Sequence, residues 1–372
     1  MQASYDDSSL DKPRPNLLRH GSHFDVPRWH LEHAPSVTRD CARTSLPGWL
    51  GQYFHPTHAT LARDDGVEKA WASRKHRKHR YAAHVPNTRR TRRYGAFHLR
   101  LASMLRVEYW NISWWVAQIF TWGSVIWVVN GFASFLPFCN SHVQFDLDLA
   151  GWTAFIGATV FEVGSVIGLL EAWNRHDAVA FSNNSSKESL DPENSDNGTK
   201  RSEDVHLEAM NTLPKADQTS TKKKWIWFST DSKYFHELGF LAAFFQLLGA
   251  TIFWISGFTA IPTIQRALEK NQGLNDGIFW TPQVVGGSGF IISAIFIMLE
   301  DSKTWWKPRP LSLGWQIGAW NFIGAIGFTL CGALGYSTSS GALYQSSLAT
   351  FWGSWAFLIA SVLQWYECVN GV

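Results

Sequence analysis

The chain has 372 residues, 21 of them Trp and 25 Phe, with a formal net charge of +3 and four Cys. The length would allow two or three soluble domains, but the composition is divided: residues 1–108 and 174–236 are polar, whereas apolar and aromatic residues dominate the rest. The four Cys lie in different regions without metal-ligand spacing. The sequence therefore predicts neither a disulfide framework nor a metal site, and we expect no cofactor.

Residues 1–108 are expected to form a disordered cytosolic tail, because Pro, Asp, Ser, His and Arg mix there without sustained periodicity. Two basic clusters, Arg74–Lys78 and Arg89–Arg93, precede the first apolar stretch. Beside a membrane span they favour contact with anionic lipid headgroups, and we expect no nucleic acid to bind there.

The end of this tail, Phe97–Trp110, places Phe97, Leu101, Met104 and Leu105 on one helical face. Two interpretations stay open. The segment is either an amphipathic helix that lies in the plane of the membrane surface or a simple extension of the first span.

Six stretches are apolar enough to cross a bilayer, which requires ~20 residues, and each is expected to be a helix because backbone amides cannot stay unpaired in lipid. The fold class is therefore an all-α membrane protein with three transmembrane hairpins, in residues 109–173, 237–300 and 301–372. The expected spans are Trp114–Phe135, Trp152–Trp173, Leu238–Ile261, Trp280–Leu299, Trp315–Tyr336 and Leu343–Tyr366.

Residues 174–236 are polar and low in complexity, which predicts a disordered cytosolic loop. The loop ends in Lys222–Trp227, a basic and aromatic run suited to anionic headgroups. Lys and Arg gather before the first span, in this loop and after Glu300, and are scarce in the alternate connections. Because basic flanks stay in the cytosol, we expect six spans with both termini cytosolic. The span lengths suit several membranes.

The three hairpins carry the same residue types at the same spacing. In each first helix, a Gly is followed four residues on by an aromatic residue and eight on by another Gly: Gly123, Trp127, Gly131; Gly249, Phe253, Gly257; Gly324, Phe328, Gly332. In each second helix, a Gly is followed by Phe, a small residue and Glu: Gly157, Phe161, Gly164, Glu171; Gly286, Phe290, Ser293, Glu300; Gly353, Phe357, Ala360, Glu367. This pattern predicts three parallel repeats about an axis along the membrane normal.

Two interpretations of the repeat stay open. Its positions share one helical stripe, where small residues allow close packing in lipid and the Phe fills the adjacent groove. Alternatively, the three equivalent faces line a central pathway. The carboxylates at the cytosolic helix ends, Glu171, Glu300 and Glu367, either pair with nearby bases such as Arg175 or Lys303, or converge on a ring that attracts cations.

Glu162 lies near the middle of the second span, where inserting an acid costs about 2.5–3.5 kcal/mol. Such a residue needs a polar partner, and the candidates are Gln118, Asn130, Gln246 and Asn321. One hypothesis is that Glu162, with Gln118, Gln246 and Asn321, forms a protonatable proton or ion site. The alternative is a neutral, hydrogen-bonded structural acid.

Gly123-Ser124 in the first span, Gly164-Ser165 in the second, and Phe161 resemble the paired-helix unit of the YrhK-like membrane domain. With its Trp-rich Trp110–Trp115 run, the chain as a whole is similar to uncharacterised fungal multi-pass membrane proteins that contain such units. The resemblance implies membrane location and fold, and no chemistry. The mitochondrial carriers are excluded, because the Pro-acid-base motif of their odd helices is absent from the corresponding spans.

Three functional classes compete. The sequence favours a non-enzymatic scaffold or regulatory membrane protein whose tails bind protein partners or anionic lipid. The alternative is a small-solute or ion transporter or channel that uses Glu162. A membrane-embedded enzyme would need a cluster of His, Asp, Cys or Ser near one interface, and the spans show none, so we expect no enzymatic activity.

Overall fold

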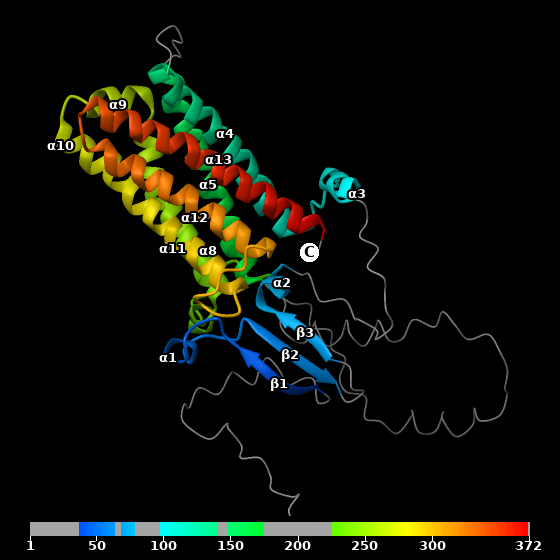
Figure 1. Cartoon of the computed structure of the whole chain (residues 1–372). Helices are drawn as coiled ribbons and strands as arrows, with labels where there is room; N and C mark the ends of the chain where they lie inside the picture. The colour runs from blue at the N-terminus through cyan, green and yellow to red at the C-terminus, as the bar shows by residue number, and fades with distance from the viewer. Residues whose placement is uncertain (1–36, 64–67, 79–96, 140–146, 175–224, 371–372) are drawn as a thin grey trace, which may run out of the picture.

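The computed structural model describes residues 37–63, 68–78, 97–139, 147–174 and 225–370 (Figure 1). Six of its helices are long and apolar enough to cross a membrane, and each contains most of an expected span. The chain is therefore an integral membrane protein in contact with the lipid bilayer. The spanning helices are α4 (Ile112–Cys139), α5 (Leu147–Trp173), α8 (Leu238–Thr259), α11 (Thr281–Asp301), α12 (Leu313–Gly335) and α13 (Ser340–Asn370).

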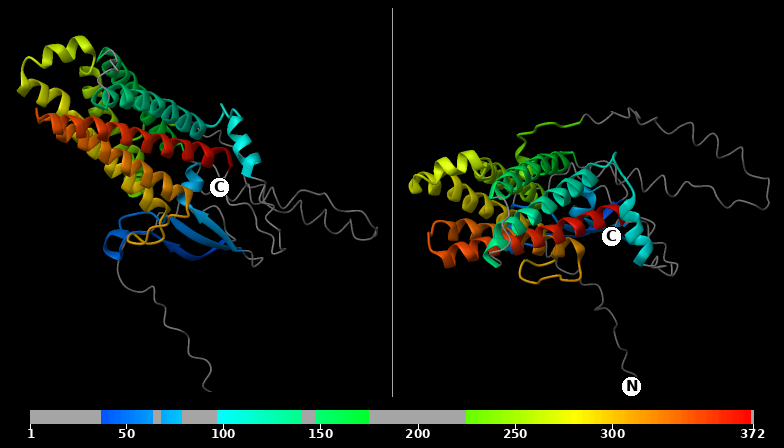
Figure 2. Two further views of the ribbon diagram at one scale, coloured as in Figure 1. Left: turned by 45° about the horizontal axis from the view of Figure 1, so that its top comes forward. Right: turned by 90° about the horizontal axis from the view of Figure 1, so that it is seen from above.

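The six spanning helices form a closed ring. Each hairpin is antiparallel, α5 packs on α8, α11 packs on α12, and α13 returns to pack on α4 (Figure 2). Consecutive helices in the sequence are thus neighbours in space, and the first and last spans close the circle. The interior of the ring is the core of the protein.

The two ends of the ring differ. At one end, called here the α9 end, lie the short helices α9 (Pro262–Leu268) and α10 (Gln272–Asn275), followed by a π-helical turn, η4 (Asp276–Trp280), that leads into α11. At the other end, called the sheet end, lie the C-terminal end of α13 and a small β-sheet (Figure 1).

The sheet corrects the prediction of a disordered tail for residues 37–63 and 68–78; residues 1–36, 64–67 and 79–96 lie outside the described residues. Strands β1 (Val37–Arg43), β2 (His58–Arg63) and β3 (Glu68–Ala72) form an antiparallel meander, with α1 (Gly48–Gly51) between the first two. The connection between α1 and β2 holds the sheet to the bundle: His55 N donates to His236 O at 2.8 Å, and the His236 ring contacts Tyr53 O at 2.7 Å. These contacts are distant in sequence, so the local pattern gave no sign of them.

Strand β3 continues directly into α2 (Ser73–Arg77), which lies between the sheet and the end of the ring (Figure 1). The segment before the first span forms α3 (Phe97–Ala102) and a 3-10 turn, η2 (Ser103–Leu105). Both are separated from α4 by residues 106–111, so the segment is not a continuous extension of that span. The side chain of Asn370 holds it to the end of α13 by donating to Arg100 O at 3.2 Å.

The predicted disordered loop 174–236 is also ordered at its end, in residues 225–236. The Asn174 side chain donates to Ile226 O and accepts from Ile226 N, both at 2.7 Å. A 3-10 turn, η3 (Ser232–His236), follows. Its Tyr234 packs with Trp173 and Phe240 in a buried aromatic cluster, which secures this connection against the bundle.

Candidate functional site

Within each hairpin, the first glycine of the repeat in one helix packs against the repeat aromatic residue of the partner helix. A methyl group at Gly123 would lie 2.7 Å from the Phe161 ring, and one at Gly157 would lie 2.8 Å from the Trp127 ring. The other two hairpins repeat this exchange, with Gly286 against Phe253, Gly249 against the Phe290 backbone, Gly324 against Phe357 and Gly353 against Phe328. The contacts agree with the packing interpretation of the motif.

The second glycine of each first helix packs between hairpins. Gly131 of α4 meets Phe351 of α13, Gly257 of α8 meets Ala158 of α5, and Gly332 of α12 meets Val284 of α11. Each first helix therefore contacts the second helix of the preceding hairpin around the ring, in three equivalent places. The small residues of the second helices, Gly164, Ser293 and Ala360, are also in close contact with their surroundings. Gly164 lies against Phe120, Ser293 donates to Ala242 O, and Ala360 is fully buried.

All six repeat aromatics meet at the centre of the ring. They are Trp127, Phe161, Phe253, Phe290, Phe328 and Phe357, each at most 5% exposed. Their ring centroids are close, from 4.8 Å for Trp127 and Phe328 to 6.4 Å for Trp127 and Phe161. We call this set the aromatic layer. It blocks the axis at mid-height and is the feature that the repeated spacing builds.

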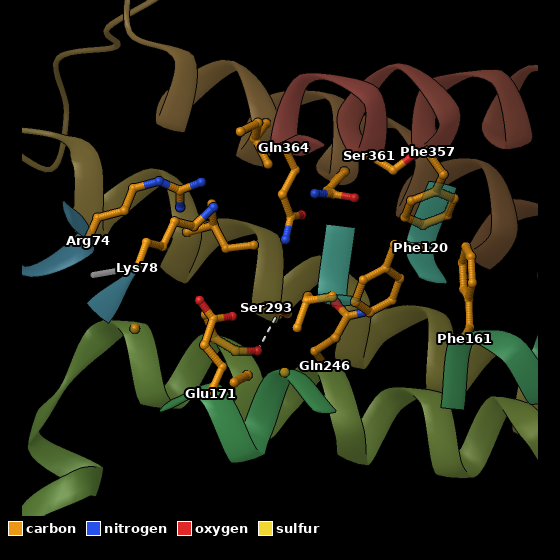
Figure 3. A pocket seen from close by; sticks show the side chains of 18 of the residues that line it. Arg74, Lys78, Phe120, Phe161, Glu171, Gln246, Ser293, Phe357, Ser361 and Gln364 are labelled. Atoms are coloured by element: carbon orange, nitrogen blue, oxygen red, sulfur yellow. Dashed lines mark hydrogen bonds between the residues drawn. The ribbon is translucent and has the colours of Figure 1, made fainter. Parts of the chain in front are cut away.

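A cavity of about 90 Å³, called the sheet-end chamber, lies between the aromatic layer and α2. Figure 3 shows Arg74 and Lys78 on one side of it and Phe120, Phe161 and Phe357 on the other. The volume accommodates several waters. All six spanning helices contribute to its wall, whose polar members are Ser124, Glu171, Gln246, Ser293, Asn321, Ser361 and Gln364.

A larger cavity of about 360 Å³, the α9-end cavity, lies on the other side of the aromatic layer. Trp127, Phe253 and Phe328 form its floor. Again all six spanning helices line it, together with α9 and η4. Its polar lining residues are Asn130, Ser134, Asp148, Ser256, Gln265, Arg266, Glu269, Gln283, Cys331, Ser346, Ser347 and Thr350.

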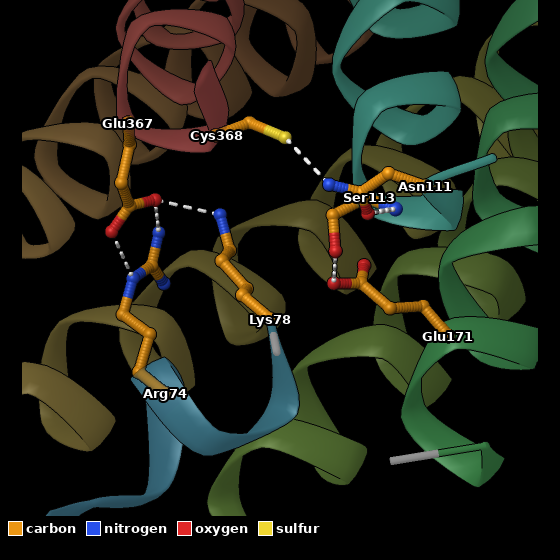
Figure 4. A network of polar contacts seen from close by, with 7 residues as sticks. All are labelled: Arg74, Lys78, Asn111, Ser113, Glu171, Glu367 and Cys368. Atoms are coloured by element: carbon orange, nitrogen blue, oxygen red, sulfur yellow. Dashed lines mark hydrogen bonds and ion pairs between the residues drawn. The ribbon is translucent and has the colours of Figure 1, made fainter. Parts of the chain in front are cut away.

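Arg74 and Lys78 close the sheet-end chamber at its outer side. The sequence predicted that both residues contact lipid. Arg74 donates from Nε and Nη2 to the two oxygens of Glu367, each at 2.9 Å, and Lys78 Nζ donates to Glu367 Oε2 at 2.6 Å (Figure 4). Arg74 and Lys78 are each 5% exposed. Burial lowers the pKa of Arg74, but the neighbouring Glu367 carboxylate raises it above its ordinary value, so the guanidinium stays charged.

The other two repeat carboxylates, Glu171 and Glu300, are also buried, so neither is a solvated charge. Glu171 accepts from Ser113 Oγ at 2.6 Å (Figure 4), and Glu300 accepts from Ser73 Oγ of α2 at 3.2 Å. Glu367 pairs with Arg74 of α2 and with the adjoining Lys78, in place of Lys303. Arg175 lies outside the described residues.

The predicted site around Glu162 does not come together. Gln246 and Asn321 line the sheet-end chamber, whereas Glu162 and Gln118 line neither cavity. Glu162 is half-buried on α5, and its Oε1 accepts from Thr251 Oγ of α8 at 2.9 Å, a partner that the sequence did not suggest. Glu162 therefore lies at the α5–α8 seam, away from the axis.

We expect the double variant Glu162→Leu, Thr251→Val to be as stable as the wild type, or more stable by up to ~1 kcal/mol, because both members of a polar pair are replaced by apolar groups. Thr251→Val alone leaves the acid without its donor and should cost about 1–3 kcal/mol. Thermal unfolding in detergent measures both. A double variant less stable than Thr251→Val would contradict the structural role of this pair.

Arg74 and Lys78 are the site residues that sequence reasoning missed. The available signal was their spacing: four residues apart, they share a helical face, which is the arrangement that reaches a single carboxylate. Within the described residues, no group of three or more His, Cys, Asp and Glu is placed to hold a metal ion.

Comparison of the chain with protein-family models, with curated proteins and with solved structures found no match. The two cavities and the residues that close them therefore carry the functional inference.

Proposed function

We propose that the protein passes a small solute along the axis of the helix ring, with the aromatic layer as the central barrier. The observation that supports this is the pair of polar cavities on opposite sides of the layer, each lined by all six spanning helices. Polar side chains inside a membrane protein are costly and mark solute pathways.

We take this conformation to be the closed state of the proposed pathway. The aromatic layer separates the cavities, and α2 closes the sheet-end chamber through the bond of Arg74 and Lys78 to Glu367. Passage then requires the aromatic side chains to move and α2 to leave. Glu162 has no part in this pathway, so the Glu162→Gln variant should keep the wild-type rate.

Truncating the aromatic layer is expected to raise flux. Phe328 contacts Trp127, Phe253 and Phe357 with centroids 4.8 to 5.6 Å away, so Phe328→Ala opens the layer at its centre. A barrier lowered by ~1.4 kcal/mol would raise the rate about tenfold. The measurement is light scattering by proteoliposomes after an osmotic step with neutral solutes of increasing size, alongside dye-reported proton and potassium flux.

The matched control is Trp122→Ala on α4, which removes an aromatic side chain that is 65% exposed on the outside of the ring. Its flux should equal that of the wild type. Since Phe328→Ala also removes core packing, Phe328→Leu provides a milder opening, and only variants that elute as a single species are compared. Unchanged flux in both Phe328 variants, for every solute and ion, would remove the basis of the proposed pathway.

Three further features belong to the proposal. The basic flanks support a cytosolic sheet end with both termini inside. The equivalent glycine and aromatic contacts of the three hairpins support an internal repeat, arranged in parallel about the axis. The exposed Trp225 and Trp227, which follow Lys222–Lys224, support contact with anionic headgroups. The resemblance to fungal YrhK-like paired-helix proteins adds membrane location and fold.

The scaffold role favoured by the sequence stays a second candidate. The observation that supports it is the ordered sheet at one end of the ring, where Trp49 and Tyr53 are exposed, 69% and 48% respectively. Large exposed aromatics outside the membrane are typical of a protein-binding surface. Flux that changes in the Phe328 variants favours the pathway. No flux, together with a protein partner that binds the wild type and does not bind Trp49→Ala, favours the scaffold.

A further inference from the structure

The α9-end cavity has the dimensions of a ligand site. Its volume of about 360 Å³ falls at the lower end of the ~300–1,000 Å³ typical of small-molecule pockets. The aromatic layer forms the floor of the cavity and the six spanning helices form its wall, so a molecule inside it would contact protein on those sides. A site of this size selects a ligand with few heavy atoms.

The deep part of the cavity offers hydrogen bonds without charge. Asn130 is fixed by donating from its amide to Ala150 O at 2.6 Å, and Ser256 donates to Gln283 Oε1 at 3.5 Å. Ser346 donates to the backbone of Cys331 at 2.9 Å. These amides and hydroxyls are held in place before any ligand arrives, which lowers the entropic cost of binding.

The charged residues that line the cavity lie at its outer rim. Asp148 and Arg266 form an ion pair there with side chains 38% and 62% exposed, and Glu269, which follows α9 directly, is exposed. The remaining lining residues are uncharged. An anion or a hydrated metal ion placed against the floor would lose its hydration without meeting a counter-charge, so the deep site disfavours these ions.

The floor is aromatic. Trp127, Phe253 and Phe328 line the cavity beside the amides and hydroxyls of its wall and make its floor apolar. A molecule that suits both has a C–H face and several hydroxyl groups. We infer that the α9-end cavity binds a small uncharged polyol and that, resting on the proposed function, polyols are the solute class that the protein passes.

Cys331 is a reporter inside this cavity. Replacing Cys41, Cys139 and Cys368 with Ser leaves it as the single thiol. In liposomes it should react with hydroxyethyl methanethiosulfonate faster than with the trimethylammonium-ethyl or sulfonatoethyl reagents, after each rate is divided by its rate with a free thiol. Glycerol, erythritol and sorbitol should protect it, by about tenfold at ten times Kd for the best of them, and choline chloride should not.

Two controls make the result specific. A single-Cys variant that keeps Cys139, which is exposed at the end of α4, should react equally with the normalised reagents and gain no protection. Gln283→Leu should weaken polyol protection of Cys331, and Gln283→Glu should shift its preference to the cationic reagent. Circular dichroism and a single elution peak confirm that each variant folds.

The outcomes separate this inference from the proposed function. Protection by polyols without flux through Phe328→Ala leaves a polyol site and removes the pathway. Flux without polyol protection leaves the pathway and overturns the ligand class. Faster labelling by the cationic reagent, together with protection by choline, overturns the polyol assignment in favour of an organic cation. If no reagent reaches Cys331, the cavity is closed to solutes and the inference is wrong.

Discussion

Replacing Glu367 with Leu is expected to destabilise the protein by ~3–5 kcal/mol, because Arg74 and Lys78 would stay buried without their carboxylate partner. If α2 leaves the bundle to restore hydration to both bases, part of this cost is recovered and the segment becomes accessible. Two measurements follow: the thermal unfolding temperature in detergent, and the rate at which trypsin cleaves after Arg74 and Lys78. Both should change together.

Lys75 provides the matched control for this variant. It lies on α2 beside Arg74 but is exposed, so Lys75→Gln should leave both the unfolding temperature and the cleavage rate unchanged. The triple variant Arg74→Met, Lys78→Met, Glu367→Met removes the whole buried ion group and should recover most of the stability. A Glu367→Leu protein with normal stability and unaltered cleavage would show that α2 is not held by this carboxylate.

The aromatic layer and the α2 closure at the sheet end have different effects on solute flux. Glu367→Leu acts only at the sheet end, so its flux should stay low while the aromatic layer is intact. Combined with Phe328→Ala, it should exceed the flux of Phe328→Ala alone. Two barriers in series predict this order, because removing the smaller one matters only after the larger one is gone.

The six spans and the shared stripe of glycines and aromatics could be predicted from sequence because both depend on local rules. A bilayer imposes ~20 apolar residues on each helix, and the glycine and aromatic spacing places those side chains on one stripe. The same rule also locates Glu162. It follows Phe161 directly, and consecutive residues in a helix point about 100° apart, so an axial Phe161 turns Glu162 toward a neighbouring helix. The hypothesis of an ion site at Glu162 did not take this rotation of about 100° from Phe161 into account.

The closure at the sheet end could not be predicted in this way. Arg74 and Glu367 are separated by 293 residues, and no local period links them. The sheet that precedes α2 has short strands, and the bundle holds it through Tyr53 and His55, which contact His236 from a distant part of the chain. Basic residues before a first span usually face lipid headgroups. Arg74 and Lys78 were therefore assigned to lipid contact, although their four-residue spacing also allows both to reach one carboxylate.

Gly286→Ala is expected to destabilise the α8–α11 contact by ~1–3 kcal/mol or more, because the added methyl group meets backbone and has no space to move. It would lie 2.6 Å from Gly249 O and 2.7 Å from Phe253 N, so the two helices must separate. Gly353, its counterpart in the third hairpin, has its nearest neighbours at 3.2 Å, and Gly353→Ala should cost less. Unfolding temperatures in detergent give the order.

Gly168 of α5 is the control, because a methyl group there meets nothing within 4 Å. Gly168→Ala should be neutral or stabilising by up to ~1 kcal/mol, the usual gain of helix propensity. The same chemical change should therefore have opposite signs at two glycines of the same membrane bundle. Equal effects at Gly168 and Gly286 would mean that the close backbone approach does not set the stability of the ring, and the repeated glycines would then need another explanation than helix contact.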